Sequence, residues 1–139
     1  MKQEQIEQLI ELAIKQLEFS YTPYSGFKVG AALLAENGEI YTGCNIENAA
    51  YTPCNCAERT AFFKAVSEGV RTFRAICVVG GKEGILTEYA APCGVCRQVM
   101  MEFCNPDTFQ IILATSKEKY DIYTLKELLP IGFGPGNLA

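Results

Sequence analysis

The sequence predicts an α/β fold in which helices cover a mixed β-sheet. Two observations carry this prediction. Two strand-like segments joined by a tight turn come early in the chain, and helical and strand-like segments then alternate. Strands joined by a tight turn pair antiparallel, whereas strands joined through a helix pair parallel, so this order implies a mixed sheet. Right-handed crossovers would place two of the helices on the same face of that sheet.

Apolar periodicity and terminal signals predict the helices. The N-terminal helix has one apolar face, formed by Ile6, Leu9, Ile10, Ala13, Ile14 and Leu17. A second helix is expected from Ala57 to Glu68, with Gly69 as its stop signal. Pro92 is expected to open a third helix, because proline suits the first helical turn. A short fourth helix is expected around residues 125–129.

Five segments have the apolar and β-branched character of strands. The first two are Phe27–Ala35 and Glu39–Thr42, joined by the turn signal Glu36-Asn37-Gly38. The later ones are Ala75–Val79, Phe109–Ala114 and Tyr120–Tyr123. The glycine-rich tail, residues 131–136, is expected to be irregular. In open α/β folds of this kind, ligands bind where helix N-termini meet one edge of the sheet.

Composition indicates a single globular domain spanning residues 1–139. The hydrophobic share of 49% and the charged share of 20% are ordinary for such a domain. The net charge is −4, and lysine and arginine form no run, so no nucleic-acid partner is expected, because that binding depends on neutralising phosphates. No apolar run approaches membrane-spanning length, so no membrane partner is expected either.

The chain has seven cysteines, and its polar first residues indicate a helix start instead of a signal peptide. We therefore expect a cytoplasmic protein, where closely spaced cysteines serve metal binding more often than disulfides. Cys44, Cys77 and Cys104 are expected to be small core residues.

Cys56, Cys93 and Cys96 are the candidate ligands of one zinc ion. The chain has no histidine, so zinc would have to be held by thiolates. Three protein ligands leave the fourth position open, which is the arrangement of catalytic zinc sites. Cys93 and Cys96 are spaced to reach one ion at a helix start, where the helix dipole favours thiolate. A redox pair and plain buried cysteines are the alternatives, and Cys54 competes with Cys56 as the third ligand.

Glu58 is the candidate catalytic residue. It lies two residues after Cys56, in the first turn of the expected second helix, and this offset is also what favours Cys56 over Cys54 as the ligand. A carboxylate beside a zinc site can take a proton from water and deliver it elsewhere. Nucleobase deaminases use a glutamate in this way. The alternative is an acid placed at a helix start by the dipole alone.

The chain resembles the small, three-cysteine cytidine deaminases along almost its whole length. The matching segments are residues 21–32, 43–51, 56–59 and 92–98, which include Phe27-Lys-Val-Gly-Ala-Ala and Asn45-Ile-Glu-Asn. The resemblance implies a cytidine-deaminase-like three-layer fold with a five-stranded mixed sheet between helices. It also implies a zinc-dependent hydrolase with one Zn²⁺ per chain, which deaminates cytidine and 2′-deoxycytidine in pyrimidine salvage and assembles as a homotetramer.

Further roles follow from the resemblance. Arg59 would donate to a ligand sulfur and offset the excess negative charge of three thiolates, with Arg97 as a weaker candidate. Asn45 and Glu47 would hold the ribose hydroxyls. The remaining substrate-binding candidates are Phe27 against the pyrimidine ring, the backbone near Ala57 and Pro92 at its amide edge, Phe133 reaching into a neighbouring subunit's pocket, and Tyr51 at the pocket, the interface or both.

Three alternatives remain open at this point. One is a deaminase of a cytosine-bearing antibiotic or a modified nucleoside, which the intact Asn45-Ile-Glu47 segment disfavours. Another is a zinc-stabilised binding protein without turnover. The third is a nucleic-acid editor, which the acidic charge balance and the short chain disfavour.

Overall fold

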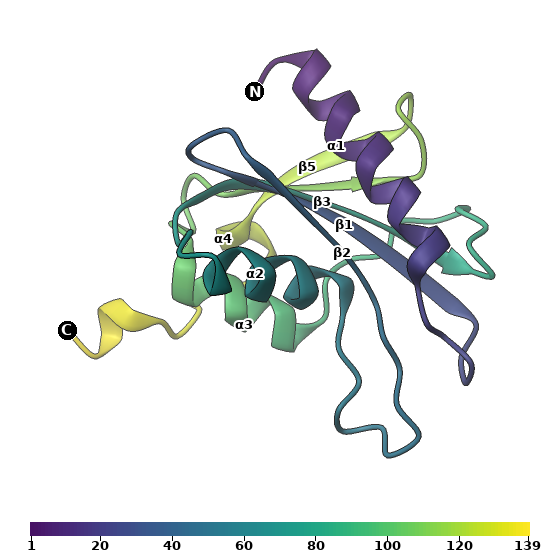
Figure 1. Cartoon of the computed structure of the whole chain (residues 1–139). Coiled ribbons are helices and arrows are strands. Elements are labelled where there is room, and N and C mark those ends of the chain that lie inside the picture. The colour runs from purple at the N-terminus through teal and green to yellow at the C-terminus, as the bar shows by residue number, and fades with distance from the viewer.

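A five-stranded mixed sheet forms the middle layer of the computed structural model, which describes all 139 residues (Figure 1). Its strands lie in the order β2-β1-β3-β4-β5. Only β3 and β4 pair in parallel, while β1 is antiparallel to both of its neighbours and β5 is antiparallel to β4. The predicted mixed sheet is confirmed, with the bounds β1 Phe27–Ala35, β2 Ile40–Cys44, β3 Phe73–Lys82, β4 Gln110–Ala114 and β5 Tyr120–Thr124.

Helices cover both faces of the sheet. In Figure 1, α1 crosses one face, and α2, α3 and α4 lie together on the other. The bounds of the helices are α1 Gln3–Lys15, α2 Ala57–Ser67, α3 Gly94–Phe103 and α4 Leu125–Leu128. Two short 3₁₀ segments, Gln16–Phe19 and Pro135–Asn137, follow α1 and interrupt the C-terminal tail. The two longer helices that carry the candidate site therefore share one face.

Each sheet face has its own core, because successive side chains of a strand point to opposite faces. Leu33 and Val78 belong to the core beneath α2 and α3, whereas Leu34 and Cys77 belong to the core beneath α1. The strands β1, β3 and β4 are buried on both faces, which explains their nearly continuous apolar sequence. Cys44, Cys77 and Cys104 are all buried, as expected for small core residues.

Several element boundaries differ from the sequence prediction by one to three residues, among them β2, which runs from Ile40 to Cys44 and not from Glu39 to Thr42. Pro92 does not open the third helix, because Cys93 is the N-cap and the helix begins at Gly94. Leu17 lies beyond α1, in the 3₁₀ segment that continues its course. Strand β3 extends three residues past Val79 to Lys82, since the antiparallel pairing with β1 continues to Phe27. Periodicity detects the apolar middle of β3 but not this polar end.

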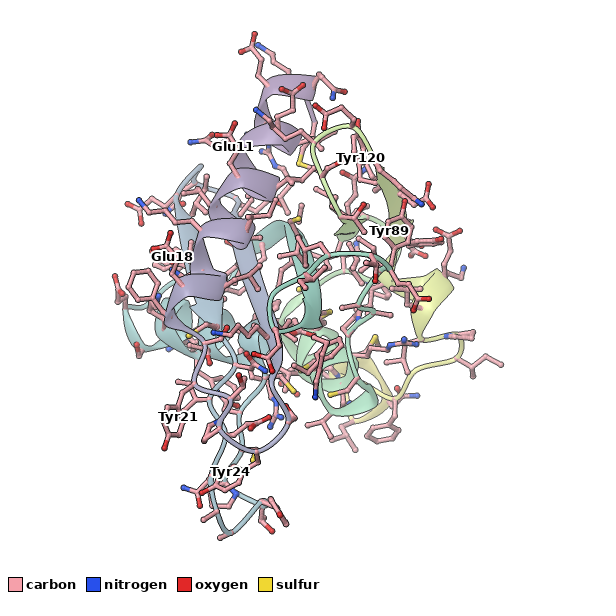
Figure 2. All side chains as sticks on the ribbon, turned by 90° about the vertical axis from the view of Figure 1, so that its right-hand side faces the viewer. Glu11, Glu18, Tyr21, Tyr24, Tyr89 and Tyr120 are labelled. Atoms are coloured by element: carbon pink, nitrogen blue, oxygen red, sulfur yellow. The ribbon has the colours of Figure 1, made fainter.

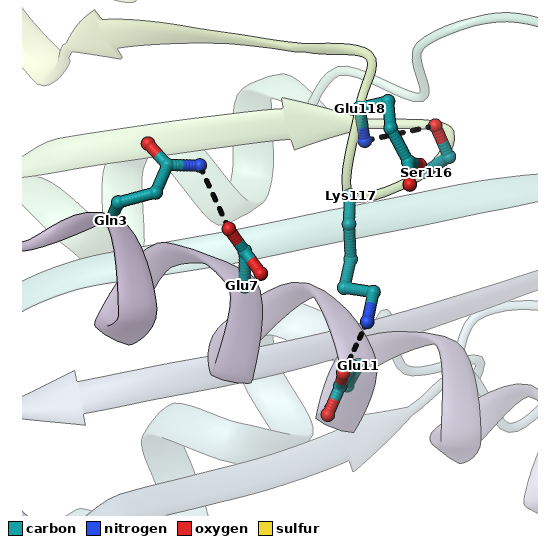
Figure 3. Close-up of polar contacts among 6 residues, drawn as sticks. All are labelled: Gln3, Glu7, Glu11, Ser116, Lys117 and Glu118. Carbon is teal, nitrogen blue, oxygen red and sulfur yellow. Dashed lines mark hydrogen bonds and ion pairs between the residues drawn. The ribbon is translucent and has the colours of Figure 1, made fainter.

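Polar contacts tie the outer side of α1 to the loop after β4 (Figure 3). Lys117 Nζ in the loop lies 2.7 Å from Glu11 Oε1, while within α1 Gln3 Nε2 donates to Glu7 Oε2 at 3.1 Å. Exposed ion pairs of this kind contribute about 0–1 kcal/mol, so the apolar core under α1 holds the helix in place. No α-helix of the chain combines the length and apolar character needed to cross a membrane.

Candidate active site

A pocket of about 300 Å³ opens at the edge of the sheet where α2 and α3 begin. The first residues of β1, the end of β2 and the end of β3 meet at this edge, because Phe27 pairs with Lys82 and Gly30 with Cys44. The walls combine apolar residues with a few polar ones: Phe27, Val29, Asn45, Ile46, Glu47, Cys54, Asn55, Cys56, Glu58, Arg59, Val78, Ala90, Ala91 and Cys93. Such a lining is typical of small-molecule sites.

Three cysteine sulfurs converge at this pocket, where Cys56 and Cys93 line the wall and Cys96 is buried beside them. Cys56 and Cys93 are the N-caps of α2 and α3, and neither side chain caps its own helix, so both are available to a ligand. Their Sγ atoms are 3.7 Å apart, and Cys93 Sγ lies 3.6 Å from Cys96 Sγ. All three sulfurs lie within 4.8 Å of one another. Sulfurs bound tetrahedrally to zinc at about 2.3 Å are separated by about 3.8 Å, so the cluster fits one Zn²⁺ per chain.

The surroundings of the cluster favour thiolate. The adjacent Cys96 thiol, together with Arg59, lowers the pKa of Cys56 to about 5. Hydrogen bonding to Cys56 raises the pKa of Cys96, because one thiolate disfavours a second beside it. A divalent cation would remove this conflict by replacing the shared proton. The guanidinium Nη2 of Arg59 donates to Cys56 Sγ at 3.3 Å, which is the contact expected for charge compensation.

Glu58 is the one buried charged residue of the chain, with 3% of its surface exposed. It follows Ala57 in the first turn of α2, and the face formed by Ala57, Ala61 and Ala65 packs into the core. Burial raises the pKa of Glu58 to about 7, since a carboxylate loses its hydration in this position. A group with this pKa can both accept and release a proton near neutrality.

Asn45 and Glu47 line the other end of the pocket and also fasten the start of β1. The Oδ1 atom of Asn45 accepts from Val29 N at 3.0 Å, and its Nδ2 donates to Phe27 O at 2.8 Å. Glu47 Oε1 accepts from Tyr24 N at 3.0 Å and from Ser25 N at 3.1 Å. The Ser25 hydroxyl donates to Glu47 Oε2 and is the main cause of the lowered pKa of that carboxyl.

Phe27 joins this end of the pocket as a wall residue that is 42% exposed, so part of the residue is free to meet a ligand. Ala57 is fully buried and does not line the pocket, so the contact of its backbone with a ligand stays a prediction. Pro92 O accepts from Arg97 Nε at 2.7 Å, and Arg97 Nη1 donates to Leu128 O at 2.6 Å. These contacts direct Arg97 to backbone carbonyls, so the weaker candidate for the thiolate contact has another role.

Tyr51 and Phe133 do not line the pocket of their own chain. Tyr51 has a φ of 62° in the loop between β2 and α2, is 70% exposed, and meets Tyr24 edge-on with ring centroids 6.1 Å apart. This loop projects beyond the sheet in Figure 1, and Figure 2 shows Tyr21 and Tyr24 at the same end of the molecule. Phe133 is 57% exposed on the tail, where its carbonyl accepts from Gln98.

Some pocket residues were not singled out from the sequence. Ala90 and Ala91 come from the loop between β3 and α3, and Val78 is a core strand residue whose neighbours give no sign of a site. Cys54 also lines the pocket, but its sulfur accepts from Asn48 N at 3.2 Å and lies outside the metal cluster. Ser25 lies in the matching segment 21–32 but was given no role there, and its contacts to Glu47 and Phe27 connect it with the site.

Comparison with known proteins agrees with this geometry. The profile of the cytidine and deoxycytidylate deaminase zinc-binding region matches residues 3–112. The chain belongs to the cytidine and deoxycytidylate deaminase family. Within this family it is 52% identical to cytidine deaminase from Sporosarcina psychrophila over 134 residues, covering 96% of this chain and 95% of the relative.

Solved structures of the deaminase family have the same fold. The crystal structure of cytidine deaminase from Burkholderia pseudomallei superposes with a TM-score of 0.82 at 46% identity, covering 91% of this chain and 97% of that one. Cytidine deaminase from Mycobacterium tuberculosis gives a TM-score of 0.77 at 35% identity, with 91% and 95% coverage. The cytidine-deaminase-like fold implied by the resemblance is therefore confirmed.

Proposed function

We propose that this chain is a zinc-dependent cytidine deaminase that hydrolyses cytidine and 2′-deoxycytidine to uridine and 2′-deoxyuridine with release of ammonia. The observation that carries the proposal is a buried glutamate with a pKa of about 7 that lines the same pocket as Cys56 and Cys93, two members of the three-thiol cluster. Hydrolysis at an electrophilic ring carbon needs an activated water and a group that moves protons, and these residues provide for both.

Cys56, Cys93 and Cys96 are the proposed zinc ligands, and zinc bound there would supply a water whose pKa lies near neutrality. Three thiolates outweigh the charge of the ion by one and would weaken that effect. Arg59 offsets the excess, because its guanidinium donates to Cys56 Sγ at 3.3 Å. Glu58 lines the same pocket as Cys56 and Cys93, where it could exchange a proton with that water.

Glu58 is the proposed proton carrier. It takes a proton from the attacking water and gives it to N3 of the pyrimidine, which makes C4 a better electrophile. It then transfers the second water proton to the departing amine, so that cytidine and water become uridine and ammonia. A pKa near 7 suits both directions of transfer, because the driving force for taking and for giving the proton is then balanced.

Asn45 and Glu47 are proposed to read one sugar hydroxyl. A carboxylate offers about four lone-pair positions, and the backbone and Ser25 occupy three of those on Glu47. Asn45 Nδ2 has two hydrogens, and one is donated to Phe27 O. One acceptor position and one donor hydrogen remain, which together satisfy a single hydroxyl. The 3′-hydroxyl is the proposed one, with the exposed part of Phe27 against the base.

The rest of the proposal concerns the assembly, the location and the metabolic role of the enzyme. We propose a homotetramer in which Tyr51 and Phe133, both exposed and outside their own pocket, contribute to a neighbouring subunit. A cytoplasmic location and a role in pyrimidine salvage fit the seven free cysteines and the nucleoside substrate. The chain is proposed to act as one catalytic domain, without nucleic-acid or membrane partners.

A nucleoside panel tests the proposed activity. The absorbance change as cytosine becomes uracil gives kcat/KM for cytidine, 2′-deoxycytidine, 3′-deoxycytidine, free cytosine and cytidine 5′-phosphate. Cytidine and 2′-deoxycytidine should be the best substrates, and the other three should be poor. If cytidine is not turned over, the result would favour a zinc-stabilised binding protein. If a cytosine-bearing antibiotic or a modified nucleoside is a clearly better substrate than cytidine, the result would favour a deaminase of that compound.

A further inference from the structure

Ser25 does not line the pocket, but it makes several hydrogen bonds to residues at the pocket and at the end of β3. Its backbone N–H and its hydroxyl both donate to the Glu47 carboxylate. The same hydroxyl accepts from Phe27 N at 3.0 Å. Its carbonyl accepts from Lys82 Nζ at 2.6 Å. Every polar atom of this residue is thus engaged, and each engagement leads either to a pocket residue or to the end of β3.

The turn that carries Ser25 is held from the neighbouring strand. Lys82 is paired with Phe27 across the β1–β3 ladder, so its side chain leaves the sheet on the same face as the pocket residue Phe27. The next residue, Glu83, donates its N–H to Gly26 O at 2.6 Å. Gly26 has a φ of 68°, which suits a residue without a Cβ. These contacts give the turn one position relative to Glu47.

We propose that Ser25 is a positioning residue that holds the Glu47 carboxylate in the orientation that receives the sugar hydroxyl, with Lys82 anchoring the turn from β3. This inference rests on the proposed contact between Glu47 and the substrate. A glutamate side chain has freely rotating bonds, and an unrestrained carboxylate would lose entropy on binding. The three contacts from Tyr24 and Ser25 fix it in advance and leave one acceptor position for the ligand.

The charge environment agrees with this role. The Ser25 hydroxyl, supported by the positive charge of Lys82, lowers the pKa of Glu47, so the carboxylate stays ionised and remains an acceptor. Removing the hydroxyl leaves the two backbone N–H contacts to Oε1 in place, but Oε2, which has the free position, loses its restraint. The expected defect is therefore in sugar recognition and not in folding of the pocket.

The experiment compares Ser25→Ala with the wild-type enzyme on cytidine and on 3′-deoxycytidine. KM for cytidine should rise roughly threefold to tenfold, which corresponds to one ordinary hydrogen bond, with kcat almost unchanged. KM for 3′-deoxycytidine should change much less, because that substrate lacks the group that Glu47 receives. Ser25→Thr keeps a hydroxyl and should restore KM. Lys82→Met should give a smaller defect of the same kind.

Ser116→Ala is the matched control. Ser116 also accepts backbone N–H groups in a turn, from Glu118 and Lys119, but it lies in the loop after β4 near α1 (Figure 3). The Ser116→Ala variant should leave KM for cytidine and KM for 3′-deoxycytidine unchanged. Thermal melting curves should show Ser25→Ala folded like the control.

Glu47→Gln separates the two levels of the inference. Suppose that Glu47→Gln raises KM for cytidine more than KM for 3′-deoxycytidine, while Ser25→Ala changes both KM values equally or changes neither. The positioning role of Ser25 is then overturned and the sugar contact of Glu47 stands. If Glu47→Gln itself does not distinguish the two substrates, the proposed sugar contact is wrong and the role of Ser25 is overturned with it. Deamination of cytidine by the wild type remains testable in either case.

Discussion

The pKa values of Glu58 and Glu47 differ because the two carboxyl groups have different surroundings. Burial raises the pKa of Glu58 to about 7, whereas a hydroxyl donor lowers the pKa of Glu47 at the other end of the same pocket. One carboxyl is thereby suited to carrying protons and the other to accepting hydrogen bonds. Catalytic sites often contain two carboxyl groups whose pKa values are moved in opposite directions by their surroundings.

Glu58→Gln should retain fold and zinc but lose roughly 10²- to 10⁴-fold in kcat, because glutamine has almost the same shape and cannot carry the proton. Steady-state kinetics with cytidine and metal analysis of the purified variant check this expectation. Glu68→Gln, at an exposed position at the end of the same helix, is the control and should be fully active. Turnover above half of the wild-type value would exclude Glu58 as the proton carrier.

Cys56→Ala and Cys54→Ala should differ sharply in zinc content, although the two residues are only two positions apart. Cys56 Sγ belongs to the three-sulfur cluster, whereas Cys54 Sγ is engaged by Asn48. Wild type and Cys54→Ala should contain one zinc per chain, and Cys56→Ala should lose most of it. Atomic absorption measures the ratio. Full zinc occupancy in Cys56→Ala would mean that Cys54 substitutes as a ligand.

At the scale of elements, the site depends on how closely α2 approaches the sheet. A Cβ added to Gly43 would lie 2.4 Å from Ala57 O and 2.7 Å from Ala61 N, so only glycine allows β2 and the first turn of α2 to meet. The side chain of Thr60 adds contacts to the same junction, donating to Cys44 O at 3.1 Å. This junction sets the positions of Cys56 and Glu58 at the start of the helix.

Gly43→Ala should therefore push α2 outward, destabilise the protein by roughly 1–3 kcal/mol and reduce zinc retention. Urea unfolding followed by circular dichroism gives the first quantity, and zinc release to a chelator the second. Gly136→Ala is the control, because a Cβ there would meet nothing within 4 Å and its φ is not positive. Equal stability of the two variants would show that the helix can shift without cost.

At the scale of the whole molecule, several large apolar side chains are exposed in the loop between β2 and α2 and in the C-terminal tail. Tyr51 and Phe133 are 70% and 57% exposed, and Ile131 is fully exposed with a φ of 56°. Exposed aromatic and aliphatic groups in irregular segments are typical of surfaces that meet a partner. A symmetric assembly of identical chains is the partner we propose.

Light scattering should therefore give a mass close to four times the chain's 15.3 kDa. Phe133→Ala should weaken association or raise KM, since the side chain is proposed to reach a neighbouring pocket. Activity measured across a dilution series should fall where the assembly dissociates. A fully active monomer at assay concentration would contradict the shared-site arrangement.

Sequence alone was sufficient for the features that depend on local spacing. The α/β class follows from periodicities of 2 and 3.6 residues, which are properties of single segments. The pairing of Cys93 with Cys96 follows from a local ligand spacing, whereas Cys56 was expected to join them from the family resemblance and is brought to them by the packing of α2 beside α3. The proximity of Glu58 and Arg59 to the cluster follows from the same first helical turn.

Tertiary structure decided what depends on residues far apart in the chain. Ser25, Glu47 and Lys82 are brought together by the pairing of β1 with β3 and by the loop after β2, and no local pattern encodes that meeting. The contact of Arg97 with the carbonyl of Leu128, 31 residues along the chain, depends on long-range packing in the same way. Spacing along the chain determined which groups were available for chemistry, while long-range packing determined their burial, their acidity and the direction each one faces.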